Sequence, residues 1–273
     1  MTLVQDRPLQ RRRVAIDTEP KFIAIWGPIG STGKSTLAVN LAYELALLGK
    51  RVLLLDLDTH APALATLLPI NKGTAGLAGA ARLIRQGRFT PEELERLSIT
   101  IKYRGNKLKL LQGLASPTRW PEITPETITQ LLGVAKFNHD VIIADLASPL
   151  EDKLLGAEHP TTRNAATRTA LALSTEAISI IHGTQLSVSR YLNLFNQLDE
   201  LQKTRKIIFN RSDPNPKLAA AIKTLTRETI FGYIPNDEPA LQLAEAQNLP
   251  LALARRKAPA RAAILSLANK LLE

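Results

Sequence analysis

Short apolar runs alternate with longer stretches of helical periodicity along the chain, and this alternation predicts strands separated by helices. The runs are rich in Ile, Val and Leu, a composition typical of strands that a parallel sheet buries on both faces. They span residues 22–26, 51–58, 108–113, 140–145, 177–183, 206–210 and 230–235. We therefore expect a sheet that forms the core and is covered by helices.

The clearest helix lies between the first two runs. Over residues 34–48, leucines recur along one helical stripe, and Gly49 follows where helices commonly end. Together with the strands at 22–26 and 51–58, this helix makes a βαβ unit with parallel strands. Because the alternation continues, we predict one doubly wound α/β domain over residues 21–273, with a mostly parallel sheet and helices on both faces.

Three segments need a separate interpretation. Residues 1–20 are basic and lack a period, so we expect a flexible N-terminal tail. Residues 156–168 are polar and rich in turn formers, which predicts a loop that leads into a helix at Asn164. Residues 259–273 have apolar positions at helical spacing, and we expect Leu267 at the edge of that apolar face. We favour a last core-packing helix there over an amphipathic helix that contacts a membrane.

The stretch "GPIGSTGKST" (27–36) joins the first strand to the first helix and contains half of a phosphate-binding pattern. The pattern is G-x-x-x-x-G-K-[ST]; Gly33, Lys34 and Ser35 match its end, whereas Pro28 stands in place of its first glycine. The alternative is a glycine-rich turn with an ordinary surface lysine, but the strand before and the helix after favour a phosphate site.

Backbone N–H groups of such a loop, and of the helix N-terminus that follows it, point at phosphate oxygens. We expect Lys34 to reach the β- and γ-phosphates of a nucleotide as a catalytic residue, and the Ser35 hydroxyl to bind Mg²⁺. The expected nucleotide-binding residues of the loop are Gly30, Ser31, Thr32, Gly33, Lys34, Ser35 and Thr36.

Aspartates close two of the predicted strands, since Asp56 and Asp58 end one and Asp145 ends another. Carboxyl ends of parallel strands line the ligand crevice of an open sheet. We expect Asp145 to hold Mg²⁺, and Asp58 to contact the metal or to position the attacking water. Any one of these aspartates alone is better explained as a cap for the following loop. Three of them beside a phosphate loop favour a magnesium site.

The stretch at 33–58, "GKSTLAVNLAYELALLGKRVLLLDLD", resembles the MinD/ParA family of P-loop ATPases, which share a deviant Walker A loop. The shared elements are G-K-[ST]-T, then N-L-A, then a strand ending in D-x-D. Downstream, "IIFNR" (207–211) resembles the strand whose asparagine contacts adenine, and "IFGYIPND" (230–237) resembles the family's G-x-I-P-x-D segment. The resemblance implies ATP or ADP with Mg²⁺ as ligands, a nucleotide-dependent homodimer, and Asn210, Arg211 and Pro235 beside the base.

Within that family, the loop at 27–33 and the stretch "HPTTRNAATR" (159–168) look most like the CpaE/TadZ branch. Members of that branch are similar to MinD and help to localise pilus or secretion machinery at the cell envelope. The resemblance therefore implies a nucleotide-gated dimer that positions an envelope, pilus, secretion or division machine and binds a protein partner there.

The chain departs from the family pattern at the γ-phosphate. Ile29 replaces the lysine that reaches the partner's phosphates in the family's dimers, and Ser31 replaces the second glycine of the loop. The family's D-x-P-x-G after the magnesium aspartate reads D-L-A-S-P here, ending in Pro149. Analogous charge donors are worth about 10³–10⁵ in rate. We therefore expect ATP binding through Lys34 and slow hydrolysis unless another cation substitutes.

Two arginines in the polar segment, Arg163 and Arg168, are candidates for that cation, acting in cis or across a dimer. Plain surface arginines are the simpler interpretation.

Composition narrows the alternatives. The 273 residues include no cysteine, which excludes disulfides, thiolate metal sites and the iron–sulfur carriers that share this fold. No apolar run approaches the roughly 20 residues that span a bilayer, and the N-terminus lacks a signal-peptide core. We expect a cytoplasmic protein that can be recruited to a membrane or cell pole.

The net charge of +10 comes from scattered basic residues and fits general solubility as well as it fits a charged partner. Three kinds of partner stay open, namely DNA, an anionic membrane or an acidic protein. Alongside the positioning ATPase we therefore keep two alternatives. One is a partition ATPase that binds DNA non-specifically, which predicts salt-sensitive, ATP-dependent DNA binding. The other is a scaffold that binds nucleotide without hydrolysing it, which predicts no turnover.

Overall fold

The computed structural model describes residues 19–70, 73–103, 105–151 and 162–273. The strands are β1 (Lys21–Trp26), β2 (Val52–Leu57), β3 (Ile99–Tyr103), β4 (Asn106–Leu111), β5 (Val141–Leu146), β6 (Glu176–His182), β7 (Arg205–Asn210) and β8 (Ile230–Ile234). The helices are α1 (Lys34–Leu47), α2 (Gly76–Arg85), α3 (Pro91–Leu97), the 3₁₀ helix η1 (Pro117–Glu122), α4 (Pro125–Ala135), α5 (Ala165–Leu173), α6 (Gln185–Leu201), α7 (Pro216–Thr226), α8 (Glu238–Ala246), α9 (Leu251–Ala254) and α10 (Pro259–Leu272).

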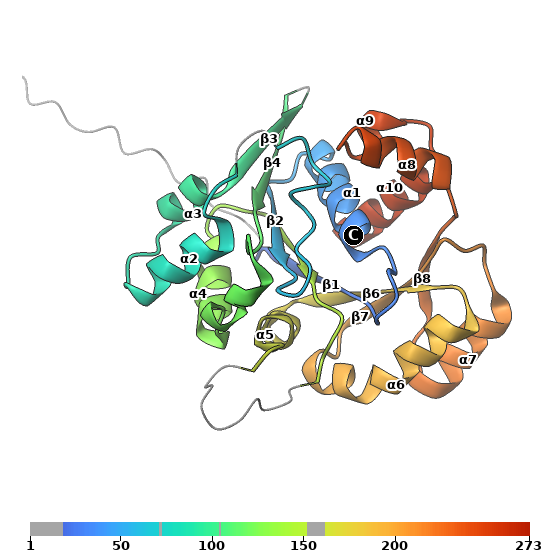
Figure 1. The fold of residues 1–273 in the computed structure, drawn as a ribbon. Coiled ribbons are helices and arrows are strands. Elements are labelled where there is room, and N and C mark those ends of the chain that lie inside the picture. The colour runs from blue at the N-terminus through green and yellow to red at the C-terminus, as the bar shows by residue number, and fades with distance from the viewer. Residues whose placement is uncertain (1–18, 71–72, 104, 152–161) are drawn as a thin grey trace, which may run out of the picture.

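All eight of these strands form one sheet, in the order β3-β4-β2-β5-β1-β6-β7-β8 (Figure 1). Neighbouring strands are parallel except for β3 and β4, which pair antiparallel. Helices cover both faces of the sheet. The prediction of a doubly wound, mostly parallel α/β fold is confirmed.

Each face of the sheet carries its own core, because successive strand residues point to opposite faces. Phe22, Ala24 and Trp26 of β1 pack with the layer of α2, α4, α5, α6 and α7. Ile23 and Ile25 of the same strand pack with the layer of α1, α8, α9 and α10. Burial on both faces explains why the central strands read as continuous apolar runs.

Strand β3 was not among the predicted runs, and the reason is its position. It is the edge strand of the hairpin with β4, and it alternates rather than running apolar. Ile101 is buried, whereas Lys102 is exposed. A strand with one covered face has a period of two, which a search for continuous apolar runs does not detect.

The C-terminal helix has the predicted core-packing role. In α10, Ile264, Leu267 and Leu271 are buried against the α1 layer, and Arg261 of the same helix donates to Glu44 Oε1 of α1 at 2.7 Å. Leu267, expected at the edge of the apolar face, is part of the buried face.

Other predicted segments are covered only in part. Helix α5 starts directly after Asn164, as expected. Residues 1–18 of the expected tail and residues 156–161 of the expected loop lie outside the described residues. Among the described helices, none has the length and apolar character needed to cross a bilayer.

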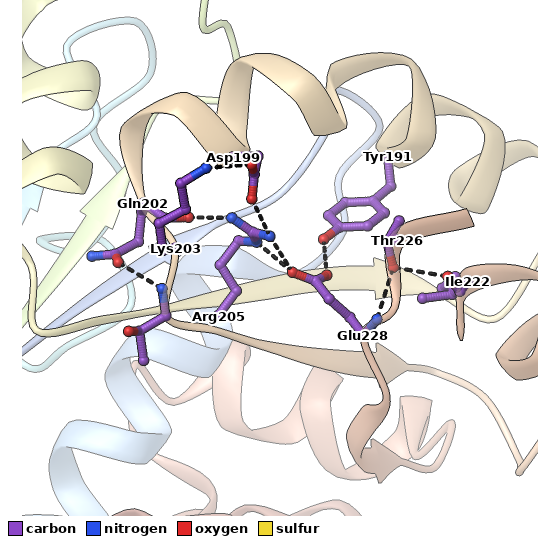
Figure 2. Close-up of polar contacts among 9 residues, drawn as sticks. Tyr191, Asp199, Gln202, Lys203, Arg205, Ile222, Thr226 and Glu228 are labelled. Atoms are coloured by element: carbon purple, nitrogen blue, oxygen red, sulfur yellow. Dashed lines mark hydrogen bonds and ion pairs between the residues drawn. The ribbon is translucent and has the colours of Figure 1, made fainter. Parts of the chain in front are cut away.

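A buried polar network fastens α6 to β7 and to the connection between α7 and β8 (Figure 2). Arg205 of β7 donates to Glu228 Oε1 at 2.5 Å and lies 2.8 Å from Asp199 Oδ1 at the end of α6. The buried Tyr191 hydroxyl of α6 donates to Glu228 Oε2 at 2.6 Å. Burial, followed by the Glu228 charge, raises the pKa of Tyr191 above its usual range, so Tyr191 stays a neutral donor.

Removing the cation from this network is expected to destabilise the fold. Arg205→Ala leaves the Glu228 carboxylate largely buried without its charge partner, and should lower the free energy of unfolding by about 3–5 kcal/mol. Lys203→Ala is the control, because Lys203 is exposed and pairs with Asp199 at the surface, and it should cost less than about 1 kcal/mol. Urea unfolding measures both; equal losses would contradict a buried charge pair at Arg205.

Candidate nucleotide site

The predicted site residues meet at the carboxyl ends of the central strands. Strand β1 lies between β5 and β6, so the strand order reverses beside it, and the loop at 27–33 leaves β1 at that point and enters α1 (Figure 1). Ligands of open α/β sheets bind in the crevice at such a switch point.

Residues in left-handed conformation shape the loop. Gly30 has φ 131°, Ser31 has φ 51° and Gly33 has φ 92°. Serine rarely adopts such a φ. Ser31 nevertheless has it in the place where the related pattern has a glycine, so the loop keeps a glycine-like turn without the glycine.

Three carbonyl oxygens of the loop contact side chains that come from the β6–α6–β7 side of the sheet. The pairs are Ile29 O with Arg190 Nη1 at 3.0 Å, Ser31 O with His182 Nε2 at 3.3 Å, and Thr32 O with Asn210 Nδ2 at 2.8 Å.

These contacts orient the N–H groups of the loop. In a trans peptide, each C=O points opposite to the N–H of the next residue. The N–H groups of Gly30, Thr32 and Gly33 therefore point away from the three side chains. Backbone N–H groups directed together in this way form the kind of concavity that binds phosphate.

The N-terminus of α1 adds to that concavity. Its N-cap residue, Gly33, makes no side-chain cap bond, and the first turn holds no acidic residue. The first N–H groups of a helix have no partner within it, and with the helix dipole they favour an anion. Lys34, the first residue of α1, donates from Nζ to Ser148 Oγ at 2.9 Å. Its ammonium thus lies on the side of the loop next to the segment that follows β5.

Asp145, at the end of β5, provides the strongest chemical signal in the site. Its side chain is fully buried, and neither carboxyl oxygen has a hydrogen-bond partner in the described part of the chain. Burial raises the pKa of Asp145 to about 7, although Ser35 and the Lys34 charge act to lower it. A buried carboxyl without a partner is costly, and a carboxylate beside a serine hydroxyl suits Mg²⁺. These residues fit the expected magnesium–nucleotide complex.

Asp56 and Asp58 both order the loop that follows β2. Asp58 Oδ1 accepts from the N–H groups of His60 and Ala61, each at 2.9 Å. Asp56 Oδ2 accepts from Ala63 at 3.1 Å and from Leu64 at 3.0 Å. The capping role weighed for these aspartates is therefore present. The role of Asp58 in metal binding or water activation stays a prediction.

Asp56 also lies beside Asp145, because the two residues are paired in register on the neighbouring strands β2 and β5. Burial, followed by the Asp145 charge, raises the pKa of Asp56 well above its usual range. Two buried carboxyls side by side disfavour ionisation of both. A bound cation would relieve that repulsion.

Arg163 and Arg168 are held by their own chain. Arg163 donates from Nη1 and Nη2 to the hydroxyl and carbonyl of Thr59, both at 3.0 Å, and lies 5.2 Å from the Trp120 ring centroid. Burial lowers the pKa of Arg163, and the Asp58 charge opposes that shift. Arg168 donates to Leu150 O at 3.0 Å. Their proposed role as charge donors stays a prediction.

The residues expected beside the base lie together at the ends of β7 and β8. Asn210 is paired in register with Ile234, which directly precedes Pro235. Arg211 turns the chain with φ 50°. The amide of Asn210 bonds the loop in this structure, so contact with adenine would require it to share or exchange that bond.

Three residues that lie at the site were not predicted from the sequence. Ser148 accepts from Lys34 and also, through its carbonyl, from Trp26 Nε1 at 3.0 Å. His182 and Arg190 hold the loop from β6 and α6. No local motif marks a lone histidine or arginine. His182 and Arg190 could therefore have been placed at the site only from the order of the strands in the sheet.

The family model for the CobQ/CobB/MinD/ParA nucleotide-binding domain matches residues 23–251. That range covers the strands, the loop and the aspartates described above. The chain belongs to this family.

Sequence relatives of this nucleotide-binding domain include proteins of different function. An iron–sulfur cluster carrier protein of Pyrococcus horikoshii is 30% identical over 158 residues, covering 54% of this chain and 50% of the relative. The chain thus spans about half the length of that relative. No cysteine occurs among the 273 residues to supply cluster thiolates.

Solved structures share the fold at lower identity. A ParA family ATPase from Chlorobium tepidum has a TM-score of 0.77 at 21% identity, covering 91% of this chain and 98% of that one. The septum site-determining protein MinD of Pyrococcus horikoshii, complexed with Mg-ADP, has a TM-score of 0.72 at 19% identity, covering 92% and 96%.

The raised pKa of Asp145 predicts how stability without nucleotide depends on pH. The folded chain binds the proton more tightly than the unfolded chain, so the Asp145 contribution to the free energy of unfolding falls as pH rises from about 4 to about 7. Asp145→Asn should therefore raise the melting temperature of the nucleotide-free protein at pH 8 and weaken this pH dependence. The same variant should lose stabilisation by Mg-nucleotide.

Thermal melts from pH 5 to pH 8, with and without Mg-ADP, measure both effects. Glu200→Gln, at an exposed position, is the control and should change neither. Loss of stability at pH 8 in Asp145→Asn would contradict an uncompensated buried carboxylate.

Proposed function

We propose that the chain binds Mg-ATP and Mg-ADP at the loop of residues 27–36 and acts as a nucleotide-gated homodimer with slow ATP hydrolysis. The observation that carries the proposal is the buried, unpartnered Asp145 beside Ser35 and Lys34, at the uncapped N-terminus of α1. Membership of the nucleotide-binding family supports it.

We expect slow hydrolysis because two groups are missing on the side of the site that would face the γ-phosphate. Ile29 has no charge to offer, and Pro149 has no N–H to donate. The groups expected at the β-phosphate and at Mg²⁺, Lys34, Ser35 and Asp145, are present. Loss of transition-state contacts with retention of ground-state contacts lowers turnover more than affinity.

The further role that we propose is to position an envelope, pilus, secretion or division machine from the cytoplasm, in the manner of the CpaE/TadZ branch. The support is the resemblance of the loop and of residues 159–168 to that branch. A protein partner at the envelope and recruitment to the membrane or cell pole belong to the same proposal.

Solution mass by light scattering tests the nucleotide switch. With Mg-ATP we expect a dimer, and with Mg-ADP a monomer, because only ATP carries the phosphate at the family's dimer interface. Lys34→Ala should stay monomeric in both and lose most nucleotide affinity. Lys50→Ala, an exposed lysine just beyond α1, is the matched control and should behave as wild type.

The same mass with either nucleotide, together with measurable ATP binding, would replace the switch by a non-hydrolysing scaffold. DNA binding that appears only with ATP and weakens with salt would instead favour the partition ATPase, which the net charge of +10 permits.

A further inference from the structure

A cavity of about 450 Å³ lies beside the carboxyl ends of β2 and β4, against α2. Its walls come from α2, from the loop after β2 and from the segment after β4. Of the described residues that line it, none belongs to the expected phosphate loop (27–36). Pockets for small organic molecules hold about 300–1,000 Å³. The cavity is therefore large enough for a second ligand, separate from the nucleotide.

Helix α2 leaves room for the cavity because one of its faces carries small side chains. The N-cap residue Ala75 shares that face with Ala78, Gly79 and Arg82, since residues three and four apart are neighbours on a helix. All four of these residues line the cavity. The small residues leave space, and Arg82, in the last turn of α2, brings a guanidinium to the same face.

N–H donors without acceptors gather at this cavity. Arg82 is exposed, and no hydrogen bond or ion pair joins its guanidinium to another described residue. Gln112 accepts at Oε1 from the N–H of Thr74 at 2.7 Å, whereas its Nε2 has no acceptor among the described residues. Arg119 adds a second guanidinium, which Glu122 holds at 2.6 Å. Guanidinium and amide donors of this kind suit a carboxylate.

A buried acceptor without a donor lines the same cavity. Asp56, near the end of β2, accepts at Oδ2 from the N–H groups of Ala63 and Leu64. Its Oδ1 has no hydrogen-bond partner in the described part of the chain. Burial of a carboxyl oxygen without a donor is costly. An ammonium group in the cavity would supply both a donor and a charge of opposite sign.

We propose that this cavity binds a small amino carboxylate, with the ligand's ammonium at Asp56 Oδ1 and its carboxylate at Arg82. Gln112 Nε2 donates to the ligand, and Ala75 and Ala78 line the space for its carbon chain. The ligand class follows from the walls, which combine an acceptor without a donor, a cation without an anion and small apolar side chains. The inference goes beyond the proposed ATPase function and does not depend on it.

Isothermal titration calorimetry on the full chain, without nucleotide or Mg²⁺, tests the site. The probes are β-alanine, γ-aminobutyrate and 6-aminohexanoate, a series that varies the separation of the two charged groups. At least one probe should bind with a Kd of about 1 mM or tighter, as its size allows. Hexanoate and hexylamine, which each keep only one charged group, should bind at least about tenfold more weakly than that probe.

Two substitutions locate the site on the chain. Arg82→Ala and Asp56→Asn should each weaken binding of the best probe at least about tenfold, because each removes the charge that one end of the ligand requires. Arg88→Ala is the matched control: Arg88 is exposed just beyond α2, carries the same charge and does not line the cavity. It should bind as wild type does. Thermal melts check that the variants fold.

Three outcomes would overturn the inference. The first is that wild type binds none of the amino carboxylates. The second is that hexanoate or hexylamine binds as tightly as the best of them, which contradicts the ligand class. The third is that Arg82→Ala binds as wild type does, which places the ligand elsewhere. If Asp56→Asn does not fold, Arg82→Ala and the probes with one charged group decide the matter, since Arg82 is at the surface.

Discussion

An unpaired carboxylate in the middle of the sheet is the constraint around which the site is built. Asp145 is the penultimate residue of β5, which lies between β1 and β2, and burial raises the pKa of Asp145 to about 7. Asp56 on the next strand adds a second buried carboxyl in register with it. Water cannot solvate either carboxyl, because Asp145 and Asp56 are both buried. A divalent cation bound through Asp145 and Ser35 would remove the cost, which links metal binding to the stability of the fold.

The opposite half of the sheet determines the shape of the phosphate loop. The side chains that hold its carbonyls lie between 151 and 178 residues further along the chain. They reach the loop because β6 is the parallel neighbour of β1 and β7 that of β6. The buried network of Arg205, Glu228 and Tyr191 then fixes α6 against β7. Packing away from the loop therefore supports the elements whose side chains hold the loop.

Periodicity was sufficient for most of the fold and for part of the site. The central strands could be predicted because burial on both faces leaves long apolar runs, and the loop could be predicted because strand, glycines, Lys34 and helix follow one another directly. Strand β3 was missed because only one of its faces is covered. His182 and Arg190 were missed because their role arises from strand order, which no local pattern contains. The hydrogen-bond partners of Arg163 and Arg168 could not be predicted for the same reason.

The departures from the family pattern are those that the resemblance places beside the γ-phosphate. Ile29, Ser31 and Pro149 stand at such positions, whereas the residues expected at Mg²⁺ and the β-phosphate, Lys34, Ser35 and Asp145, are present. Ser31 even keeps the left-handed backbone of the glycine that it replaces. The residues expected to bind a nucleotide are thus retained, whereas those expected to assist its hydrolysis are replaced.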